Sequence, residues 1–346
     1  MVGIASIYES IPLRTWRRQA KANLAAPTES FKGKTVLLVG ATGCILSEAI
    51  KNLADLEVSC LVFGVRNTEK AELLSDALRR EHGDSLCIAV LKVDLLSFAS
   101  VKSFAAQISK LDRIDVVVMG SAIMNTETRM TSDGWEETLQ LVHLSSALLL
   151  LLLLPKLLAD GAERPVVVTS VSSTAIQTSG PMIELPENVE DSYIETVNQV
   201  KTPSFQRDYQ YGVSKVAQAC WVRQLSLYLP ASKVQIHQLD PGSCYSPLSS
   251  ENKSAQWILW WISRPVEMCA RTVVNSCLPI EQSHGRLLLD YDLVPYPKYL
   301  DRAAGIQLQE RVWNETRQIL TAAVPETGSI YLDLLAKLQE GQPEQR

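Results

Sequence analysis

The sequence predicts an α/β fold in which a mostly parallel sheet is covered by helices on both faces. Short apolar runs of the kind that form buried strands alternate along the chain with longer segments of helical character. The first run is followed at once by a turn that contains Gly40 and Gly43, and then by a helical segment. With 346 residues, of which 46% are hydrophobic, the chain can build one large core. We therefore expect a single, doubly wound domain.

Each apolar run and each helical segment has a place in this scheme. Strands are expected at residues 35–39, 60–65, 87–93, 114–119, 165–171, 234–239 and 286–290. Helices are expected at residues 47–56, 69–82, about 98–110, about 134–158 and 211–229. The leucine-rich helix contains Leu148–Leu154, a run that Pro155 follows and that is shorter than the roughly 18 residues of a membrane span. It is expected to be buried, and it could also form the interface of a homodimer.

The domain is expected to span residues 33–336, between an N-terminal extension at 1–32 and a flexible tail at 337–346. Two stretches, at about 174–208 and 252–282, look like insertions. They would line a substrate site, because loops at the carboxyl ends of parallel strands border the ligand crevice. The second contains three tryptophans, which could instead be ordinary core residues. Within the extension, residues 11–25 could form a basic helix on the domain edge or, less favoured, on a membrane surface.

Composition excludes several classes of protein. The net charge is −5 and no basic patch stands out, so nucleic acid is not an expected partner. The seven cysteines are odd in number and lack close pairs, which indicates a reducing interior and no zinc or other metal site. Arg14, Arg17 and Arg18 lie where a secretory signal would need an apolar segment. We therefore expect a cytoplasmic location.

A tyrosine and a lysine four residues apart, Tyr211 and Lys215, predict an acid–base site. On a helix, positions i and i+4 share one face. The lysine ammonium can then lower the pKa of the tyrosine phenol towards the working range of a proton-transfer catalyst. The pair opens a helix that follows the strand at 165–171, and the next strand leads into Asp240-Pro241-Gly242.

In this setting the sequence resembles the short-chain dehydrogenase/reductase (SDR) family, and most of all fungal members from secondary-metabolite gene clusters. The resemblance runs from about residue 30 to about residue 325. It implies a Rossmann-type sheet and an active site formed by Ser173, Tyr211 and Lys215. The segments that carry it are GKTVLLVGATG (33–43), SVKSFAAQISKLDRIDVVV (100–118), LLLLPKL (151–157), YGVSKVAQACWVRQL (211–225), DPGSCYSPLSSE (240–251) and SHGRLLLDYDLVPYPKYL (283–300).

The resemblance also implies a site for NADP(H). Family members place a glycine-rich turn after the first strand, where the backbone approaches the pyrophosphate at the start of a helix. In this chain the matching coenzyme residues are Gly40, Gly43, Arg66, Asp94, Pro241 and Gly242. Arg66 lies where NADP-preferring relatives hold the 2′-phosphate, although it could be an ordinary surface arginine. Asp94 matches a residue that contacts adenine, although it could instead cap the next helix.

Four positions depart from the family pattern. Leu46 replaces the last glycine of the turn, and its side chain is expected to protrude towards the phosphates. Gly120 and Ala122 replace the asparagine and the glycine of a motif that lies along the coenzyme. Val142 replaces an asparagine that organises a water and proton relay beside the lysine, and it can neither donate nor accept a hydrogen bond. Together the changes indicate relaxed or lost coenzyme binding; the alternative is a set of shifted loops that hold NADPH in an unusual pose.

Three functions are therefore open. The four departures favour acid–base catalysis without hydride transfer or cofactor, in which an apolar polyketide- or terpenoid-like carbonyl compound is isomerised, dehydrated or cyclised. The second is an NADPH-dependent carbonyl reductase or alcohol dehydrogenase of the same pathway. The third is a non-catalytic pseudoenzyme, against which the complete trio speaks. His143 could replace the missing proton carrier, but a packed helix residue is the favoured interpretation.

Overall fold

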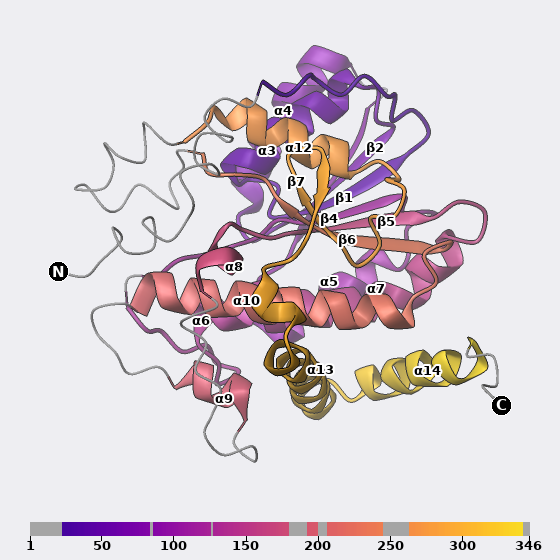
Figure 1. Ribbon diagram of the computed structural model, residues 1–346. Coiled ribbons are helices and arrows are strands. Elements are labelled where there is room, and N and C mark those ends of the chain that lie inside the picture. Colours follow the sequence, from indigo (N-terminus) through magenta and orange to yellow (C-terminus); the bar gives the residue numbers. More distant parts are fainter. Residues whose placement is uncertain are drawn as a thin grey trace.

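The apolar runs of the sequence pair into one eight-stranded sheet. The protein is represented by a computed structural model, which describes residues 23–83, 86–125, 127–179, 192–199, 206–244 and 263–341. The strands are β1 (Thr35–Val39), β2 (Cys60–Val65), β3 (Cys87–Lys92), β4 (Val116–Met119), β5 (Val166–Val171), β6 (Val234–Asp240), β7 (Leu287–Leu289) and β8 (Asp292–Val294). Their order is β3-β2-β1-β4-β5-β6-β7-β8, and each neighbouring pair is parallel except β7 and β8 (Figure 1). The predicted fold class is confirmed.

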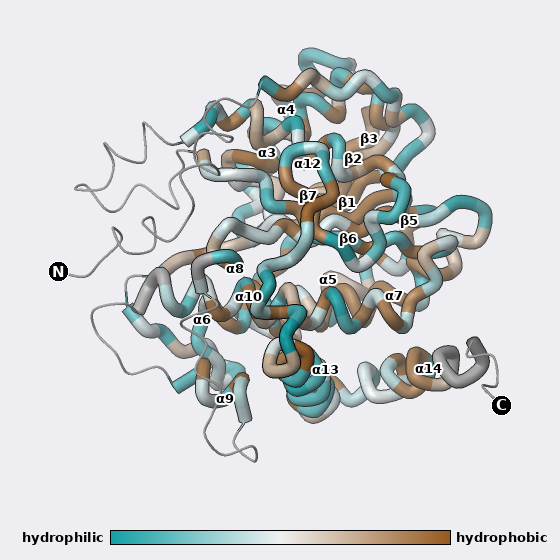
Figure 2. The backbone as a smooth tube through the Cα atoms, in the orientation of Figure 1, coloured by the Kyte–Doolittle hydropathy of each residue, from teal (hydrophilic) through white to brown (hydrophobic). Residues whose placement is uncertain are grey.

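Helices form a layer on each face of the sheet (Figure 1). One layer contains α3 (Cys44–Asp55), α4 (Thr68–His82) and α12 (Val266–Ser276), and the other contains α5 (Phe98–Ile108), α7 (Ser145–Asp160) and α10 (Gln206–Tyr228). Strand residues alternate between the two resulting cores: Val36 and Leu38 pack towards α3, whereas Leu37 and Val39 pack towards α5. Hydrophobic residues accordingly concentrate in the central strands (Figure 2).

The leucine-rich helix belongs to the interior. It consists of α6 (Glu137–Leu139), a π-helix η1 (Gln140–Leu144) and α7, which continues through Pro155 to Asp160. Among the described helices, this one is long and apolar enough to cross a membrane, but 72% of its most apolar window is buried inside the structure. The sheet, α5 and the C-terminal helix α14 (Glu326–Gly341) cover its leucines. The leucines therefore need no partner subunit, and a homodimer remains a prediction without their support.

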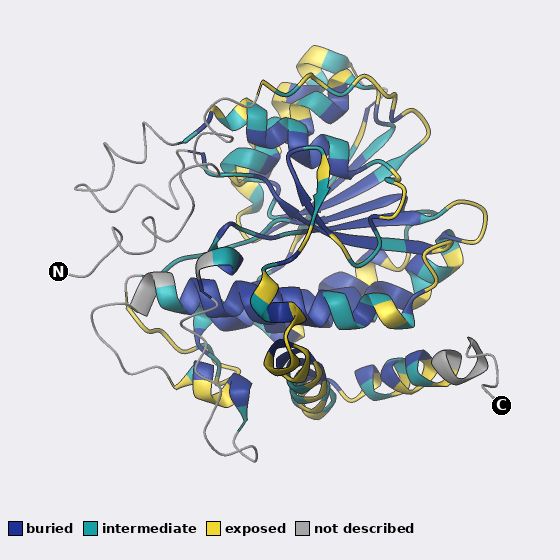
Figure 3. Ribbon diagram, viewed as in Figure 1, coloured by how far each residue is buried: buried dark blue, intermediate teal, exposed yellow. Residues whose placement is uncertain are grey.

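Two C-terminal helices add an outer layer that the sequence did not predict. A 3₁₀ turn, η3 (Lys298–Asp301), leads into α13 (Ala303–Ala323), which packs on α10. The Trp313 ring stacks on Tyr228, with centroids 4.8 Å apart, and meets Tyr331 of α14 edge-on at 5.2 Å. α10 is consequently buried along most of its described length (Figure 3). The helix α14 also extends to Gly341, into the segment expected to be a flexible tail.

The expected insertions have different fates. In the first, α8 (Ala175–Thr178) is a short helix that packs on α10, and α9 (Tyr193–Asn198) is a short helix that packs on α13. In the second, residues 252–262 with the three tryptophans lie outside the described residues. Most of the remainder forms α12, which packs against α3 as a regular member of the fold. Of the expected N-terminal helix, residues 11–22 lie outside the described residues, and residues 23–25 are not helical.

Candidate active site

The carboxyl end of β5 and the first half of α10 bring Ser173, Tyr211 and Lys215 together. Ser173 follows β5 by two residues, and its hydroxyl forms a hydrogen bond with the phenol of Tyr211. Lys215 lies one turn along α10, as the i, i+4 spacing predicts, with Nζ 5.9 Å from the centroid of the Tyr211 ring. The three side chains therefore form one constellation at the carboxyl edge of the sheet.

Burial sets the protonation of this constellation. Desolvation raises the pKa of Tyr211 to about 12, which the hydrogen bond from Ser173 only partly opposes. Desolvation also lowers the pKa of Lys215 to about 7, against the favourable charge of Asp240. The expectation that Lys215 lowers the phenol pKa is therefore wrong for the free protein, because both groups are buried and each is driven towards its neutral form. Tyr211 consequently stays protonated at neutral pH and is equipped to donate its proton.

The turn after β1 keeps the backbone shape of a phosphate site. Gly40 has φ = 91°, and a Cβ there would lie 2.6 Å from the Ser121 hydroxyl, so glycine is required on both counts. Gly43 precedes α3, whose first turn carries no side-chain cap. Lys70 of α4 donates to the carbonyl of Thr42 at 2.9 Å and fixes the turn from the other side. The N-terminus of α3 can therefore receive an anionic phosphate.

Leu46 does not protrude towards that phosphate position, and the expectation that it would is wrong. Its side chain is 3% exposed and packs in the core beneath the turn. A Cβ placed on Gly120 would lie only 2.5 Å from Leu46 Cδ1, so the leucine occupies space that a side chain at residue 120 would fill. The side-chain volume added at residue 46 therefore fills the space left by the side chain that is missing at residue 120. Two of the four departures are thus a repacking beneath the site.

The other predicted coenzyme residues lie around the same edge. Arg66, directly after β2, is exposed. The N-cap of α5 is Ser97, so Asp94 does not cap this helix. Asp94 Oδ1 instead accepts a hydrogen bond from the amide of Leu96 at 3.0 Å, within the loop that precedes α5. Ala122 is partly buried against the core on the α7 side.

The turn after β6 has a rigid support. Asp240 is buried and accepts hydrogen bonds from Thr174 Oγ1 at 2.7 Å and from the amide of Gly242 at 3.0 Å. Desolvation raises the pKa of Asp240. The guanidinium of Arg264 lies directly against Gly242, bonds the carbonyl of Pro241 and pairs with Asp290 at 2.5 Å. Sequence reasoning missed Arg264, because a single arginine before a proline carries no local motif.

Val142 is a main-chain contributor to the site. Its side chain is buried, while its carbonyl accepts a hydrogen bond from Gln218 Nε2 at 2.9 Å. Gln218 Oε1 in turn accepts from Lys215 Nζ at 3.1 Å. An amide side chain is thus hydrogen-bonded to the lysine, but it comes from α10 itself and not from residue 142. Gln218 was also missed, although its position three residues after Lys215 on the same helix was the available signal.

Two buried histidines, His143 and His237, are structural. His143 bonds Thr316 Oγ1 of α13 through Nε2 at 2.8 Å. Burial lowers its pKa to about 3, so the ring is neutral at physiological pH. His237 joins Thr169 on β5 to Ser276 at the end of α12. Neither ring reaches the trio.

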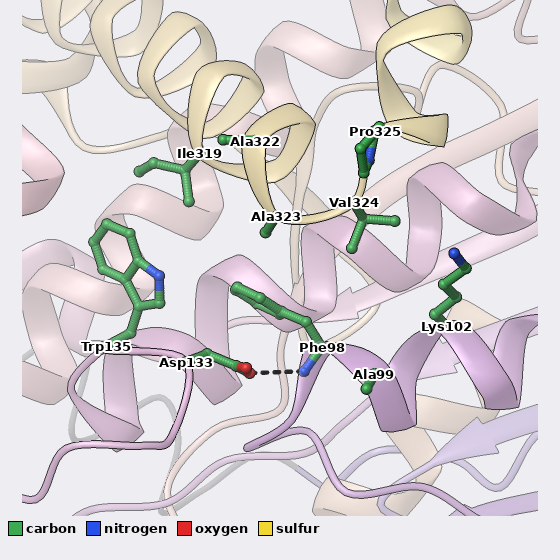
Figure 4. A pocket seen from close by; sticks show the side chains of 10 residues that line it. All are labelled: Phe98, Ala99, Lys102, Asp133, Trp135, Ile319, Ala322, Ala323, Val324 and Pro325. Atoms are coloured by element: carbon green, nitrogen blue, oxygen red, sulfur yellow. Dashed lines mark hydrogen bonds between the residues drawn. The ribbon is translucent and has the colours of Figure 1, made fainter.

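A surface hollow of about 670 Å³ lies away from the trio, between the start of α5 and the end of α13 (Figure 4). Phe98, Trp135 and Val324 give it apolar walls. Asp133 closes one end by accepting a hydrogen bond from the amide of Phe98 at 2.7 Å. None of its lining residues belongs to the predicted active or coenzyme site.

Comparison with known proteins agrees with this geometry. Residues 34–182 match the family model described as short chain dehydrogenase. The chain is 31% identical to the short chain dehydrogenase virL of Hypocrea virens, over 88% of this chain and 90% of that protein. It is 29% identical to the short chain dehydrogenase/reductase dmxR8 of a Cryptosporiopsis species, over 88% and 95%.

Solved structures share the fold. A putative uncharacterized protein from Mycobacterium paratuberculosis superposes with a TM-score of 0.63 at 21% identity, over 86% of this chain and 98% of that one. An NADPH-bound carbonyl reductase from chicken fatty liver superposes with a TM-score of 0.54 at 18% identity, over 77% and 100%. The predicted resemblance to fungal members is confirmed by the sequence relatives. The chain belongs to the short-chain dehydrogenase/reductase family.

Proposed function

We propose that the chain is an NADPH-dependent carbonyl reductase of fungal secondary metabolism, acting on an apolar polyketide- or terpenoid-like carbonyl compound. The observation that carries the proposal is the inward packing of Leu46 against Gly120, which keeps the leucine side chain out of the phosphate turn. The four departures favour coenzyme-free chemistry only if each of them is a separate loss to the coenzyme or relay site. Two of them are one volume exchange, and at the third, Val142, the main-chain carbonyl is engaged by Gln218 Nε2.

The residues present fit NADPH at its phosphate end. The turn from Gly40 to Gly43 and the uncapped N-terminus of α3 suit the pyrophosphate, and the exposed Arg66 suits the 2′-phosphate. When bound, the coenzyme would supply a hydride to the carbonyl carbon of the substrate. Pro241 and Gly242, held by Asp240, would border its nicotinamide end.

The protein's own residues would handle the carbonyl oxygen. Tyr211 is protonated at neutral pH because burial raises its pKa to about 12, so it can give its proton to the oxygen as negative charge develops there. Ser173, already hydrogen-bonded to the phenol, would share the same oxygen. Lys215, when charged, would favour the tyrosinate that remains after transfer.

Substitution of the catalytic hydroxyl tests the proposal. Tyr211→Phe should reduce ketone-dependent oxidation of NADPH by about 10²–10⁴-fold, because a positioned general acid contributes that much, while NADPH binding is retained. Aromatic ketones and quinones serve as probe substrates, and the reaction is followed by the loss of NADPH absorbance. Tyr331→Phe is the matched control, since that hydroxyl lies in the C-terminal layer, where it accepts a hydrogen bond from Trp221 Nε1 at 3.4 Å. Equal activity of the wild type and Tyr211→Phe would contradict the proposal.

Acid–base catalysis without hydride transfer is the second candidate. It is favoured by Arg264, whose buried guanidinium lies against Gly242, the residue expected beside the nicotinamide. In that case Tyr211 would move protons on the substrate alone. Its signature is incorporation of solvent deuterium into an enolisable ketone in the absence of coenzyme, abolished by Tyr211→Phe. Incorporation without NADPH, combined with no NADPH oxidation, would favour this candidate over the first.

A further inference from the structure

A side-chain bridge ties the Lys215 ammonium to the wall of the site. Nζ donates to the carbonyl of Val171 at 2.6 Å and to Oε1 of Gln218 at 3.1 Å. Nε2 of Gln218 donates onward to the carbonyl of Val142 at 2.9 Å. Lys215 is 1% exposed and Gln218 is 4% exposed, so bulk water does not compete for these bonds.

The acceptor at the far end lies in a widened stretch of helix. In an α-helix each carbonyl accepts from the amide four residues on. Across Gln140–Leu144 the helix is of the π type, and the amide of Ser145 reaches back five residues to Gln140. A widened turn shifts the helical ladder and allows a carbonyl to accept from a side chain. The bridge thus joins α10 to the π-helix behind the catalytic pair.

We propose that Gln218 is a positioning residue, which holds the Lys215 ammonium at a fixed point beside Tyr211 and occupies the place through which water would reach it. The role rests on the proposed function, because it presupposes proton transfer by Tyr211. Both ends of the amide are engaged, Oε1 as acceptor and Nε2 as donor, so a flip would set two donors against each other. A water molecule in that place could turn and exchange protons, whereas an amide carries none onward. Lys215, when charged, therefore acts from a fixed position.

The charge state of Lys215 is finely balanced, which makes it a sensitive reporter. Desolvation lowers its pKa to about 7. Asp240 of β6 opposes this by favouring the charged form, and Tyr211 is the titratable neighbour on the same helix. On the π-helix, His143 is neutral because burial lowers its pKa to about 3. A change at Gln218 Oε1, a direct acceptor of the ammonium, should therefore move the pKa of Lys215 visibly.

Two substitutions at Gln218 test the role through the pH profile of NADPH-dependent reduction. Gln218→Glu places a negative charge next to the Lys215 ammonium. The alkaline limb of the kcat/KM profile should therefore move to higher pH, by about one pH unit or more. Gln218→Leu removes the acceptor of the ammonium and should move the alkaline limb to lower pH. Gln309→Leu is the matched control, because Gln309 is equally buried and its Nε2 donates to the carbonyls of Leu300 in η3 and Gly305 in α13, at 2.8 and 2.9 Å. It should leave the limb in place.

A stability measurement separates this inference from the proposed function. The folded-state pKa of Lys215 lies below its unfolded value, so the free energy of unfolding should rise between about pH 7 and pH 10.5, relative to Lys215→Met. With Gln218→Leu the rise should begin at lower pH, and with Gln218→Glu it should begin later and be smaller. If the wild type shows no NADPH-dependent activity, the proposed function fails, yet this readout still tests Gln218. Identical pH dependence of unfolding in both variants and the wild type would overturn the positioning role.

Discussion

The coenzyme side and the proton side of this protein both depart from the family pattern, but they compensate in different ways. Beneath the phosphate turn the departure is a matter of volume, since Leu46 fills the space that Gly120 leaves. Beside Lys215 it is a matter of hydrogen bonds, since Gln218 supplies a bridge that Val142 cannot supply with its side chain. In each case the compensating residue lies on a different element from the residue it answers.

The comparison shows that neither kind of change can be judged from a single position. A large residue in place of glycine looks obstructive until its neighbour is known, because cores tolerate shape changes when the total volume is kept. A lost hydrogen-bonding side chain looks damaging until the neighbouring polar groups are counted, because buried polar atoms are nearly always satisfied by something. On the proposed function, the packing on one side and the hydrogen bonds on the other are therefore rearranged without loss of the site.

The largest effect is expected from breaking the volume exchange. Leu46→Ala should reduce the free energy of unfolding by about 2–5 kcal/mol, because it leaves a cavity in the core. Gly120→Ala should cost about 1–3 kcal/mol, because its methyl group would lie 2.5 Å from Leu46 Cδ1. In the double variant the leucine atoms that clash are gone, so the two costs should not add.

Chemical denaturation of the four proteins measures this coupling, which should be about 0.5–3 kcal/mol. Leu53→Ala supplies the control, since Leu53 lies on the same helix and is fully buried. Its cost should add to that of Gly120→Ala. Additive costs for the Leu46 pair would show that the two departures are independent.

A smaller effect is expected at Arg66, and it concerns binding. If the exposed guanidinium holds the 2′-phosphate, Arg66→Ala should weaken NADPH by about 10–100-fold, in line with the value of a hydrogen bond to a charged group. NADH, which lacks that phosphate, should be unaffected. Arg80→Ala, at an exposed arginine of α4, is the control for non-specific charge. Equal loss for both coenzymes would remove Arg66 from the site.

The smallest effect at neutral pH is expected at His143, on the proton side. The folded-state pKa of this histidine is about 3, well below its usual 6.5, so its contribution to stability is present above pH 6.5 and is lost as pH falls towards 3. His143→Gln can keep the bond to Thr316 and should change stability at pH 7 by about 1 kcal/mol or less. Its unfolding free energy should fall less steeply in acid, as thermal unfolding at several pH values would show. An unchanged acid profile would mean that His143 does not titrate as described.

Much of the fold could be predicted because its strands are short, continuous apolar runs. The strand at 35–39 was placed to the residue, and β7 differs from its predicted range only at the ends. The helices α13 and α14 were missed, because their packing depends on contacts such as that of Trp313 with Tyr228, far apart in sequence. The leucine-rich helix was predicted, but its π-helical turn was not, since no local periodicity marks it.

The candidate site likewise contains residues that the sequence predicted and contacts that it did not. Tyr211 and Lys215 could be found because helical geometry joins them, and Ser173 because a family motif follows β5. The partnership of Leu46 with Gly120 crosses from α3 to the end of β4, and no spacing in the sequence reports it. The pKa of Tyr211 was predicted in the wrong direction, because burial is a property of the packed molecule.

Direct titration with NADPH tests the central claim, that the phosphate turn is sound because Leu46 packs beneath it. Calorimetry on the folded wild-type protein should give a Kd in the micromolar range, about −8 kcal/mol. Under the same conditions Gly43→Arg, which places a long side chain in the turn, should bind much more weakly. An absence of binding heat at about 1 mM NADPH, with the protein folded, would contradict the account and favour coenzyme-free chemistry.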